Sequence, residues 1–451
     1  MLRVSKIVGL VLSSAFFMGS HAAQAESLRD VVREVLTDNP EIVGLALNRA
    51  AIEQEERQAK GLKRPNVELF GGVGVGRDDR NFVRDGARVQ GDVGVSLTQK
   101  LFDGFESKNR VIRQKARGAS ARSRVKDASN IVSLQVVRAF LEARRAHSIA
   151  ALARQNVSAH KRIVGQVRQS ANAGRGTNTQ VQQALAQLEQ ARIDLESAEL
   201  QILDARTAFF AVVGRAPGKL HKVRVPSTHF PHSVKDAVAL ATSQSPAVQA
   251  RVFDADAALS AVKVAKADRL PKVDLEASVF ETFNETPGSS GPDFDAQALV
   301  RLRYKLYGGG INRSRRREAE IRAAEARNEV EITKRTIARD VRLAYGQTTT
   351  AKRRVALMRS KASRASRILP DYVAQFDAGR RSLLDVLDIQ NDIFVNRSAA
   401  TSEEFTAKFN RFRILALSGK LVQSLGVQLP KPATQTFHLT VEDVDAWESL
   451  R

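Results

Sequence analysis

Cysteine is absent from the 451-residue sequence, and this absence excludes several classes of protein at once. Without thiols the chain has no disulfides, no thiolate metal site and no catalytic cysteine. It also has no cysteine to which a lipid anchor could be attached behind a signal peptide. The seven histidines are scattered, without carboxylates at ligand spacing, so the sequence predicts no metal site.

Long apolar runs are also missing once the N-terminus is passed. There, Arg3 and Lys6 precede an apolar stretch from Ile7 to Met18, and a small-residue A-x-A site ends at Ala25. This order is typical of a secretory signal peptide, which we predict at residues 1–25. No later stretch reaches the roughly 18 apolar residues that a membrane-spanning helix needs.

Enzyme motifs are missing as well. No nucleophile motif of the G-x-S-x-G kind occurs, and Gly71–Asp78 lacks the G-x-G-x-x-G spacing of a nucleotide loop. The sequence therefore predicts neither an enzyme nor a bound cofactor. Acidic residues are scarce beside basic ones, and the formal charge is +22. Such a charge is often typical of a protein that binds nucleic acid. An exported chain rarely meets nucleic acid, so we expect no nucleic-acid partner.

What the sequence does contain is a two-fold internal repeat. The opening SLRDVVREVLTDNPEI is echoed by SVKDAVALATSQSPAV, which sets Pro40 opposite Pro246. Later landmarks keep an offset of 205, for example Ala139-Phe140 with Ala344-Tyr345. An offset this steady indicates a duplication. The predicted units are repeat 1 at residues 26–232, repeat 2 at 233–427 and a C-terminal tail at 428–451.

Each repeat has the same predicted order of elements: a helix, two strands, a very long helix, a tight turn and a returning helix. In repeat 1 the segment from Gly104 to Asn172 contains no proline, and as one helix it would be about 100 Å long. The predicted first helices are 27–62 and 233–267, the hairpins about 67–102 and 272–307, the turns 173–176 and 378–381, and the returning helices 177 to about 213 and 382 to about 425.

Both hairpins alternate apolar and polar residues with a period of two, which gives each sheet face its own character. The length of these runs fits tilted transmembrane strands of roughly 9–11 residues, although a half-buried soluble sheet has the same pattern. Four strands cannot close a membrane barrel, because single-chain barrels begin at about eight, and open edges are not viable in lipid. If the strands span a membrane, several chains must pool them, and three chains give twelve.

This plan resembles the TolC-like outer-membrane channels of type I secretion and efflux systems. The resemblance covers nearly all of the chain. Its supports are the duplicated plan, the segments LFDGFESKNRV and LYGGGINRSRR where strand passes to helix, and most specifically FDAGRRSLLDVLDIQND at the second turn. It implies an α+β membrane protein: a homotrimer whose twelve-stranded outer-membrane barrel continues into a long periplasmic coiled-coil barrel of helices.

The resemblance also implies a function and its partners. The expected protein is a passive exit duct in the outer membrane with a large periplasmic part. A periplasmic adaptor (membrane fusion) protein and an inner-membrane ABC transporter or proton-driven pump would open it. The missing lipid-anchor cysteine favours type I secretion, with multidrug efflux as the alternative. A structural periplasmic coiled-coil protein is the alternative from another class.

Comparison of the two turns separates a helix cap from a surplus charge. Thr177 and Ser382 are N-cap residues, and Gln180 and Asp385 stand three places later, where the partner of a capping box belongs. Because glutamine fills this place in repeat 1, capping does not require a charge. Asp388 lies one turn beyond Asp385 on the same helix face. In a trimer the two become six carboxylates around one axis, which predicts an acidic, cation-selective constriction.

The resemblance assigns roles to further residues near the turns. Arg381 and Phe376 occupy the places of an arginine and an aromatic residue that lock the aperture, and phenylalanine lacks the hydroxyl group for a hydrogen bond. Independently of the resemblance, Arg313, Arg315, Arg316 and Arg317 are interpreted as a solvated helix face, with contact to anionic outer-membrane lipid as the alternative for Arg315–Arg317, just past a strand end. The turn residues expected to contact the adaptor and transporter are Gly174, Arg175, Gly379 and Arg380.

Overall fold

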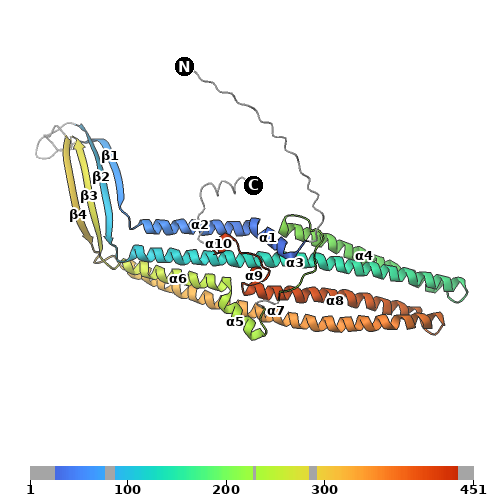
Figure 1. Cartoon of the computed structure of the whole chain (residues 1–451). Coiled ribbons are helices and arrows are strands. Elements are labelled where there is room, and N and C mark those ends of the chain that lie inside the picture. Colours follow the sequence, from blue (N-terminus) through green and yellow to red (C-terminus); the bar gives the residue numbers. More distant parts are fainter. Residues whose placement is uncertain (1–25, 77–86, 227–229, 284–291, 435–451) are drawn as a thin grey trace, which may run out of the picture.

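The computed structural model describes residues 26–76, 87–226, 230–283 and 292–434. The predicted signal peptide, most of both hairpin loops and most of the tail lie outside these residues. The described part is a long bundle of helices that carries one four-stranded sheet at its end (Figure 1). Among the described helices, none combines the length and the apolar character needed to cross a membrane.

The helices follow the same order in both halves of the chain. Those of the first half are α1 (Leu28–Asp38), α2 (Pro40–Gly61), α3 (Glu106–Asn172) and α4 (Asn178–Val213). Those of the second half are α5 (Val234–Gln244), α6 (Pro246–Ala267), α7 (Ile311–Asp377) and α8 (Leu383–Leu417), followed by the short α9 (Leu421–Ser424) and α10 (Lys431–Thr434). With 67 residues each, α3 and α7 extend for about 100 Å.

Each predicted first helix is in fact two helices, broken before a proline. Pro40 and Pro246 each stand at the start of the second helix, where the missing N–H costs nothing. A proline disfavours the helical conformation in the residue before it, and Asn39 and Ser245 have ψ angles of 123° and 127°. The Asn39 side chain also accepts hydrogen bonds from the first free amides of α2, so the break doubles as a cap.

The second returning helix ends at Leu417 and not near residue 425 as predicted. Gly419 adopts a φ of 70° there, which favours glycine. A Cβ atom at this position would lie 2.5 Å from the Cδ atom of Pro246, so the chain passes close to the start of α6. The following turn enters the core, where the Leu421 amide donates to Oδ1 of Asn130 at 3.1 Å.

The sheet joins the two halves of the chain. Its strands are β1 (Asn66–Gly76), β2 (Arg88–Phe102), β3 (Lys272–Phe283) and β4 (Pro292–Arg303), in the order β1-β2-β3-β4 and antiparallel throughout. β2 of the first half pairs with β3 of the second, which leaves β1 and β4 as edges. β4 stops at Arg303, short of the predicted 307, because its partner Lys272 is the first residue of β3 and follows a proline.

The two faces of the sheet differ completely in character. The apolar face consists of exposed aliphatic side chains, among them Val67, Leu69, Val73, Val75, Val300 and Leu302. The polar face carries ion pairs at the end nearest the helices. There, Arg301 Nε is 2.7 Å from a Glu276 carboxylate oxygen, and Arg303 Nη1 is 2.9 Å from one of Asp274. No described element covers either face in this chain.

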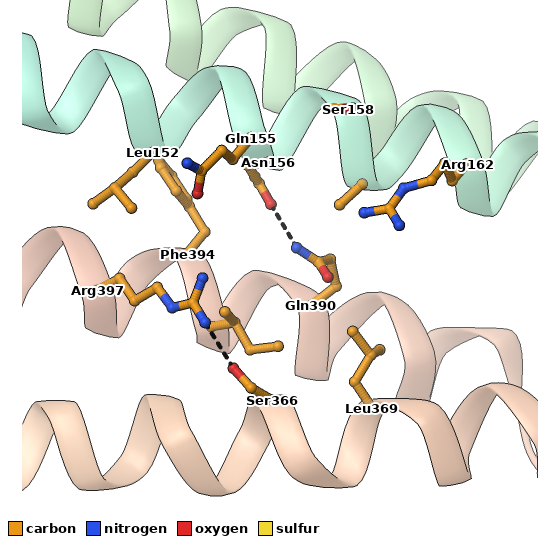
Figure 2. Close-up of a pocket in the computed structure, with 12 residues that line it drawn as sticks. Leu152, Gln155, Asn156, Ser158, Arg162, Ser366, Leu369, Gln390, Phe394 and Arg397 are labelled. Atoms are coloured by element: carbon orange, nitrogen blue, oxygen red, sulfur yellow. Dashed lines mark hydrogen bonds between the residues drawn. The ribbon is translucent and has the colours of Figure 1, made fainter.

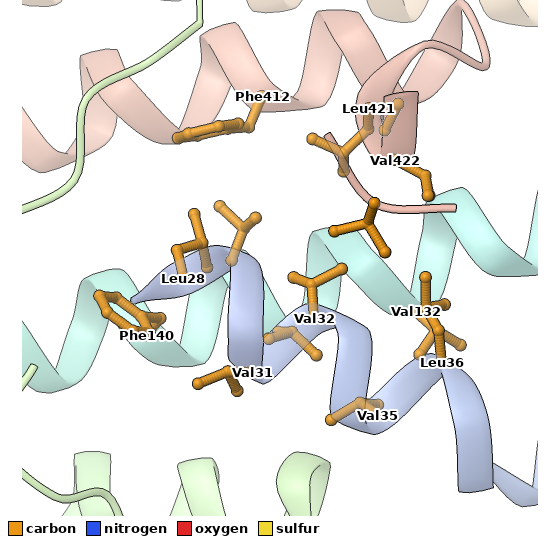
Figure 3. Close-up of a cluster of buried hydrophobic side chains, with 14 of the residues drawn as sticks. Leu28, Val31, Val32, Val35, Leu36, Val132, Phe140, Phe412, Leu421 and Val422 are labelled. Atoms are coloured by element: carbon orange, nitrogen blue, oxygen red, sulfur yellow. The ribbon is translucent and has the colours of Figure 1, made fainter. Parts of the chain in front are cut away.

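The largest hydrophobic core lies in the middle of the bundle, where α1, α3, α8 and α9 meet (Figure 3). Phe140 of α3 and Phe412 of α8 are fully buried in it, together with Leu421 of α9. The described start of the tail packs nearby, since Ala433 is fully buried and Arg49 donates to the carbonyl of Pro432. Residues 435–451 of the predicted tail lie outside the described residues.

One acidic group in this region is unfavourable when charged, and we predict a pH-dependent stability from it. Burial raises the pKa of Asp127, on α3, from 3.8 to about 6. Because the folded-state pKa is the higher one, stability is full below about pH 4 and falls as the pH rises to 6. Asp127→Asn should remove this loss and raise stability at pH 7.5 by at most about 3 kcal/mol. Thermal melts followed by circular dichroism from pH 4 to 8 measure it; parallel curves for both proteins would contradict it.

Candidate functional site

The two helical hairpins end in turns of identical backbone, at the end of the bundle away from the sheet (Figure 1). Gly174 and Gly379 both have a φ of 71°. The next amides, of Arg175 and Arg380, donate back to the carbonyls of Ser170 and Gln375 at 2.9 and 2.8 Å. This is the Schellman arrangement, which explains a glycine at the same place in both turns. All four predicted contact residues are exposed on the two tips.

The caps that follow the turns differ from one another. In the first hairpin the Gln180 amide donates to Thr177 Oγ1 at 3.3 Å, and the Thr177 amide donates to Gln180 Oε1 at 2.9 Å. This is the predicted capping box. In the second hairpin the Ser382 hydroxyl accepts from the Leu384 amide at 3.2 Å, and Asp385 does not complete a box. The prediction of Asp385 as a capping partner was therefore wrong.

Asp385 instead belongs to a set of contacts centred on Arg381. The guanidinium Nη1 atom lies 3.3 Å from Asp385 Oδ2, and Nε donates to Oε1 of Gln375 at 2.7 Å. The same group stacks on Tyr372, with Cζ 3.6 Å from the ring centroid. A planar guanidinium can stack and donate at once, which an ammonium cannot. Arg381 thus ties the end of α7 to the start of α8 within one chain.

Phe376, the other predicted lock residue, is not part of the contacts around Arg381. It packs against a hydrophobic cluster just behind the tips, the tip cluster, which draws residues from both helical hairpins. Tyr372 touches the same cluster and is the aromatic residue on which Arg381 stacks. The tip cluster comprises Val157, Ile163, Val164, Val167, Ala184, Leu188, Ala191, Leu383, Val386 and Leu387, all buried.

The two predicted aperture aspartates differ in their surroundings. The Asp385 side chain is 47 % exposed and paired with Arg381. Asp388, one turn along α8, is exposed and makes no hydrogen bond or ion pair to any described residue. Of the two aspartates, Asp388 is therefore the one whose charge is not compensated by a described partner. No group of three or more His, Cys, Asp or Glu side chains suited to a metal ion occurs among the described residues.

A polar seam behind the tip cluster was missed by the sequence reasoning. Gln390 of α8 donates to Oδ1 of Asn156 of α3 at 3.1 Å, and both side chains are buried (Figure 2). Beside them a cavity of about 440 Å³ opens between α3, α7 and α8, where Arg397 donates to the Ser366 hydroxyl at 3.1 Å. The available signal was that repeat 1 has Leu185 at the place of Gln390.

The arginines beyond the sheet have carboxylate neighbours within the chain. Arg315 lies 3.8 Å from Asp268, and Arg316 and Arg317 each lie 3.5 Å from Glu320. The side chains of Arg315 and Arg317 are largely exposed, which agrees with the interpretation as a solvated helix face, whereas Arg316 is only one third exposed. Contact with anionic lipid stays a prediction.

Taken together, these features fit a channel component. A sheet with one bare apolar face is carried on two hairpins of about 100 Å, and the charged turns lie at the opposite end. The chain belongs to the outer membrane efflux protein family, whose model matches residues 31–215 and 237–404. It therefore lies in the outer membrane, with its helical part in the periplasm.

Individual relatives cover almost the whole chain. The outer membrane efflux protein BepC of Brucella suis is 26% identical over 99% of this chain and 96% of its own length. The outer membrane protein TolC of Vibrio cholerae is 24% identical over 87% of this chain and 90% of its own. The outer membrane channel CmeC of Campylobacter jejuni has the same fold, with a TM-score of 0.75 at 14% identity, covering 87% of this chain and 86% of that one. The predicted fold class, a helical tunnel with a small β-domain, is confirmed.

Proposed function

We propose that this protein is the outer-membrane channel of a tripartite type I secretion system. It works as a homotrimer and as a passive exit duct, opened by a periplasmic adaptor and an inner-membrane ABC transporter or proton-driven pump. The observation that carries the proposal is the four-stranded sheet, which has a bare apolar face and two free edges at the end of two very long hairpins.

The sheet supports the trimer because it is incomplete alone. Free backbone groups on β1 and β4 have no partner in lipid unless another chain supplies one. Three copies joined edge to edge give twelve strands, which is within the range of closed membrane barrels. The apolar face then meets lipid, and the polar face with its ion pairs lines the lumen.

Exposed apolar stripes on the helices support the same assembly. On α4 the pairs Ile193 and Leu200, and Leu203 and Phe210, are each seven residues apart, and all four side chains are more than half exposed. Heptad spacing is typical of a seam between helices, and uncovered apolar stripes indicate an interface. Exposed apolar side chains also recur along α7, at Ile321, Ile332, Leu343 and Leu357.

At the second tip we propose an acidic aperture, formed by Asp385 and Asp388, with Arg381 and Tyr372 holding the turn in shape. The exposed turn residues of both tips, Gly174, Arg175, Gly379 and Arg380, form the contact with the adaptor and transporter. Phe376 supports the lock from the tip cluster.

Two cell-based measurements test the function. Removing the protein should abolish export of a large protein substrate while the substrate accumulates inside the cell. The family description and the name of BepC favour the second candidate, a multidrug efflux channel. In that case removal would lower resistance to dyes and antibiotics and leave protein export unchanged. A structural coiled-coil protein would form no heat-resistant trimers and would not fractionate with the outer membrane.

Replacing Arg381 tests the lock. Arg381→Ser removes the stacking on Tyr372 and the links to Gln375 and Asp385, so the second turn loosens. We expect single-channel conductance in planar bilayers to rise at least about twofold. Arg380→Ser is the matched control, because the neighbouring side chain makes no hydrogen bond or ion pair to the described residues. Equal conductance of the two variants would contradict the lock.

A further inference from the structure

Two aromatic side chains, those of Phe70 and Phe280, stand on the polar face of the sheet. A Cβ atom built on Gly94 would point at Phe70 and Phe280 together, so both rings lie on the face of that glycine. Their neighbours on the same face, two residues along each strand, include Glu68, Ser96 and Ser278. In a trimeric barrel this face lines the lumen, so two rings per chain project into a water-filled duct.

The two phenylalanines are neighbours across the sheet because the residue between them is a glycine. The strand register aligns Phe70 with Gly94, Gly94 with Phe280, and Phe280 with Asp295, as one row across all four strands. The Cζ atom of Phe70 lies 2.7 Å from the place of a Gly94 Cβ atom, and the Phe280 Cβ atom is closer still. The Phe70 ring therefore leans across β2 toward Phe280, which any larger residue at position 94 would prevent.

The surroundings of this row are acidic. The next row toward the loops contains Asp92 and Asp293, which the register joins through Thr282. A Cβ atom on Gly72 would lie 2.6 Å from Asp92 Oδ1, so this carboxylate lies flat over the glycine. It makes no hydrogen bond or ion pair to any described residue. Counting rows of this face only, Arg88 stands three rows from the phenylalanines toward the loops, and Arg301 stands three rows from them toward the helices. Each distance is roughly 20 Å along the strands.

These side chains line a hollow of about 520 Å³ on the polar face. Its lining includes the side chains of Phe70, Phe280, Asp92, Gln90 and Thr282, together with the glycines Gly72, Gly74 and Gly91. Aromatic faces attract cations, most strongly weakly hydrated organic ones, and a nearby carboxylate adds to that attraction.

We propose that Phe70 and Phe280 form an aromatic collar in the lumen, which binds lipophilic organic cations during transit. In the trimer six rings and the carboxylates of Asp92, Asp293 and Asp295 surround one axis, so the collar slows such cations relative to anions of equal size. The inference rests on the proposed trimeric channel, because only barrel closure places the polar face around a lumen.

Block of single-channel current in planar bilayers tests the collar. Tetraphenylphosphonium, added on the barrel side, should block the wild-type trimer reversibly, while the size-matched anion tetraphenylborate should not. Phe70→Ala with Phe280→Ala should weaken the block at least about tenfold. Phe70→Leu with Phe280→Leu retains apolar bulk and removes the ring faces, and it should weaken the block to a similar degree. Leu299→Ala, another apolar side chain of the polar face, is the matched control and should leave the block unchanged.

The outcomes separate the collar from the channel itself. An equal block of the wild type and both double variants, in trimers that conduct normally, overturns the collar and leaves the proposed function intact. Equal block by the cation and the anion also overturns it. A wild-type protein that forms no conducting trimer contradicts the proposed function, and the collar with it.

Discussion

Gly94→Val is expected to abolish assembly of the channel. A Cβ atom at this position would lie 2.7 Å from Phe70 Cζ and 2.9 Å from the Val279 carbonyl oxygen, and it would overlap the Phe280 Cβ atom. The carbonyl belongs to the backbone of β3 and cannot move aside without breaking the β2–β3 ladder. That ladder holds the two halves of the sheet together, so the valine variant should yield no heat-resistant trimer and no protein in the outer-membrane fraction.

Gly74→Val provides the matched control for this variant. Gly74 is also a strand glycine of the polar face, but a Cβ atom there would meet no atom within 4 Å. We expect trimer yield close to that of the wild type on a heated detergent gel. Equal trimer yields from Gly94→Val and Gly74→Val would contradict the close packing at Gly94.

Neutralising the acidic aperture should produce the second large effect. Asp385→Asn with Asp388→Asn removes six carboxylates from the mouth of a trimer. We expect the cation preference of the open channel to fall roughly tenfold, and block by hexaamminecobalt(III) to be lost, because rings of charge set the selectivity of a pore. Reversal potentials in a salt gradient measure the first effect, and titration of the current measures the second.

The single variants distinguish the two aspartates. Asp385 is paired with Arg381 and Asp388 has no such partner, so Asp388→Asn should account for most of the change. Asp392→Asn is the matched control, because this carboxylate lies further along α8 and is paired with Lys361 at 2.9 Å. Unchanged selectivity in the Asp385→Asn, Asp388→Asn double variant would refute the aperture.

Much of the fold was predictable because its signals are periodic and occur twice. Period-two alternation located the strands, and the absence of proline located α3. The errors arose where a single residue overrides a pattern. Pro40 breaks the first helix although the apolar pattern continues, and Gly419 ends α8 because the chain must pass Pro246. The proline break can be read from the sequence, whereas the approach of Gly419 to Pro246 joins residues far apart in the chain and cannot be inferred from spacing.

At the second tip the internal repeat was more informative than any single motif. Asp385 and Asp388 stand where repeat 1 has glutamines, and Arg381 stands opposite Gly176. The same comparison would have indicated Tyr372 and Gln390, because repeat 1 has Val167 and Leu185 at the equivalent positions. The stacking of Arg381 on Tyr372 could not be predicted, because Phe376 and Tyr372 lie one turn apart and spacing does not decide which of them turns toward the guanidinium.

Edge-to-edge closure of the sheet is the central claim, and disulfide trapping tests it most directly. The chain has no cysteine, so a single cysteine at Leu69 of β1 can be combined in turn with one at Ala296, Ala298 or Val300 of β4. These two strands are opposite edges of the sheet within one chain. Closure by three chains predicts that oxidation of at least one pair in membranes yields a covalent trimer, with three times the mass of one chain. Monomers at every pair in the oxidised membranes would contradict it.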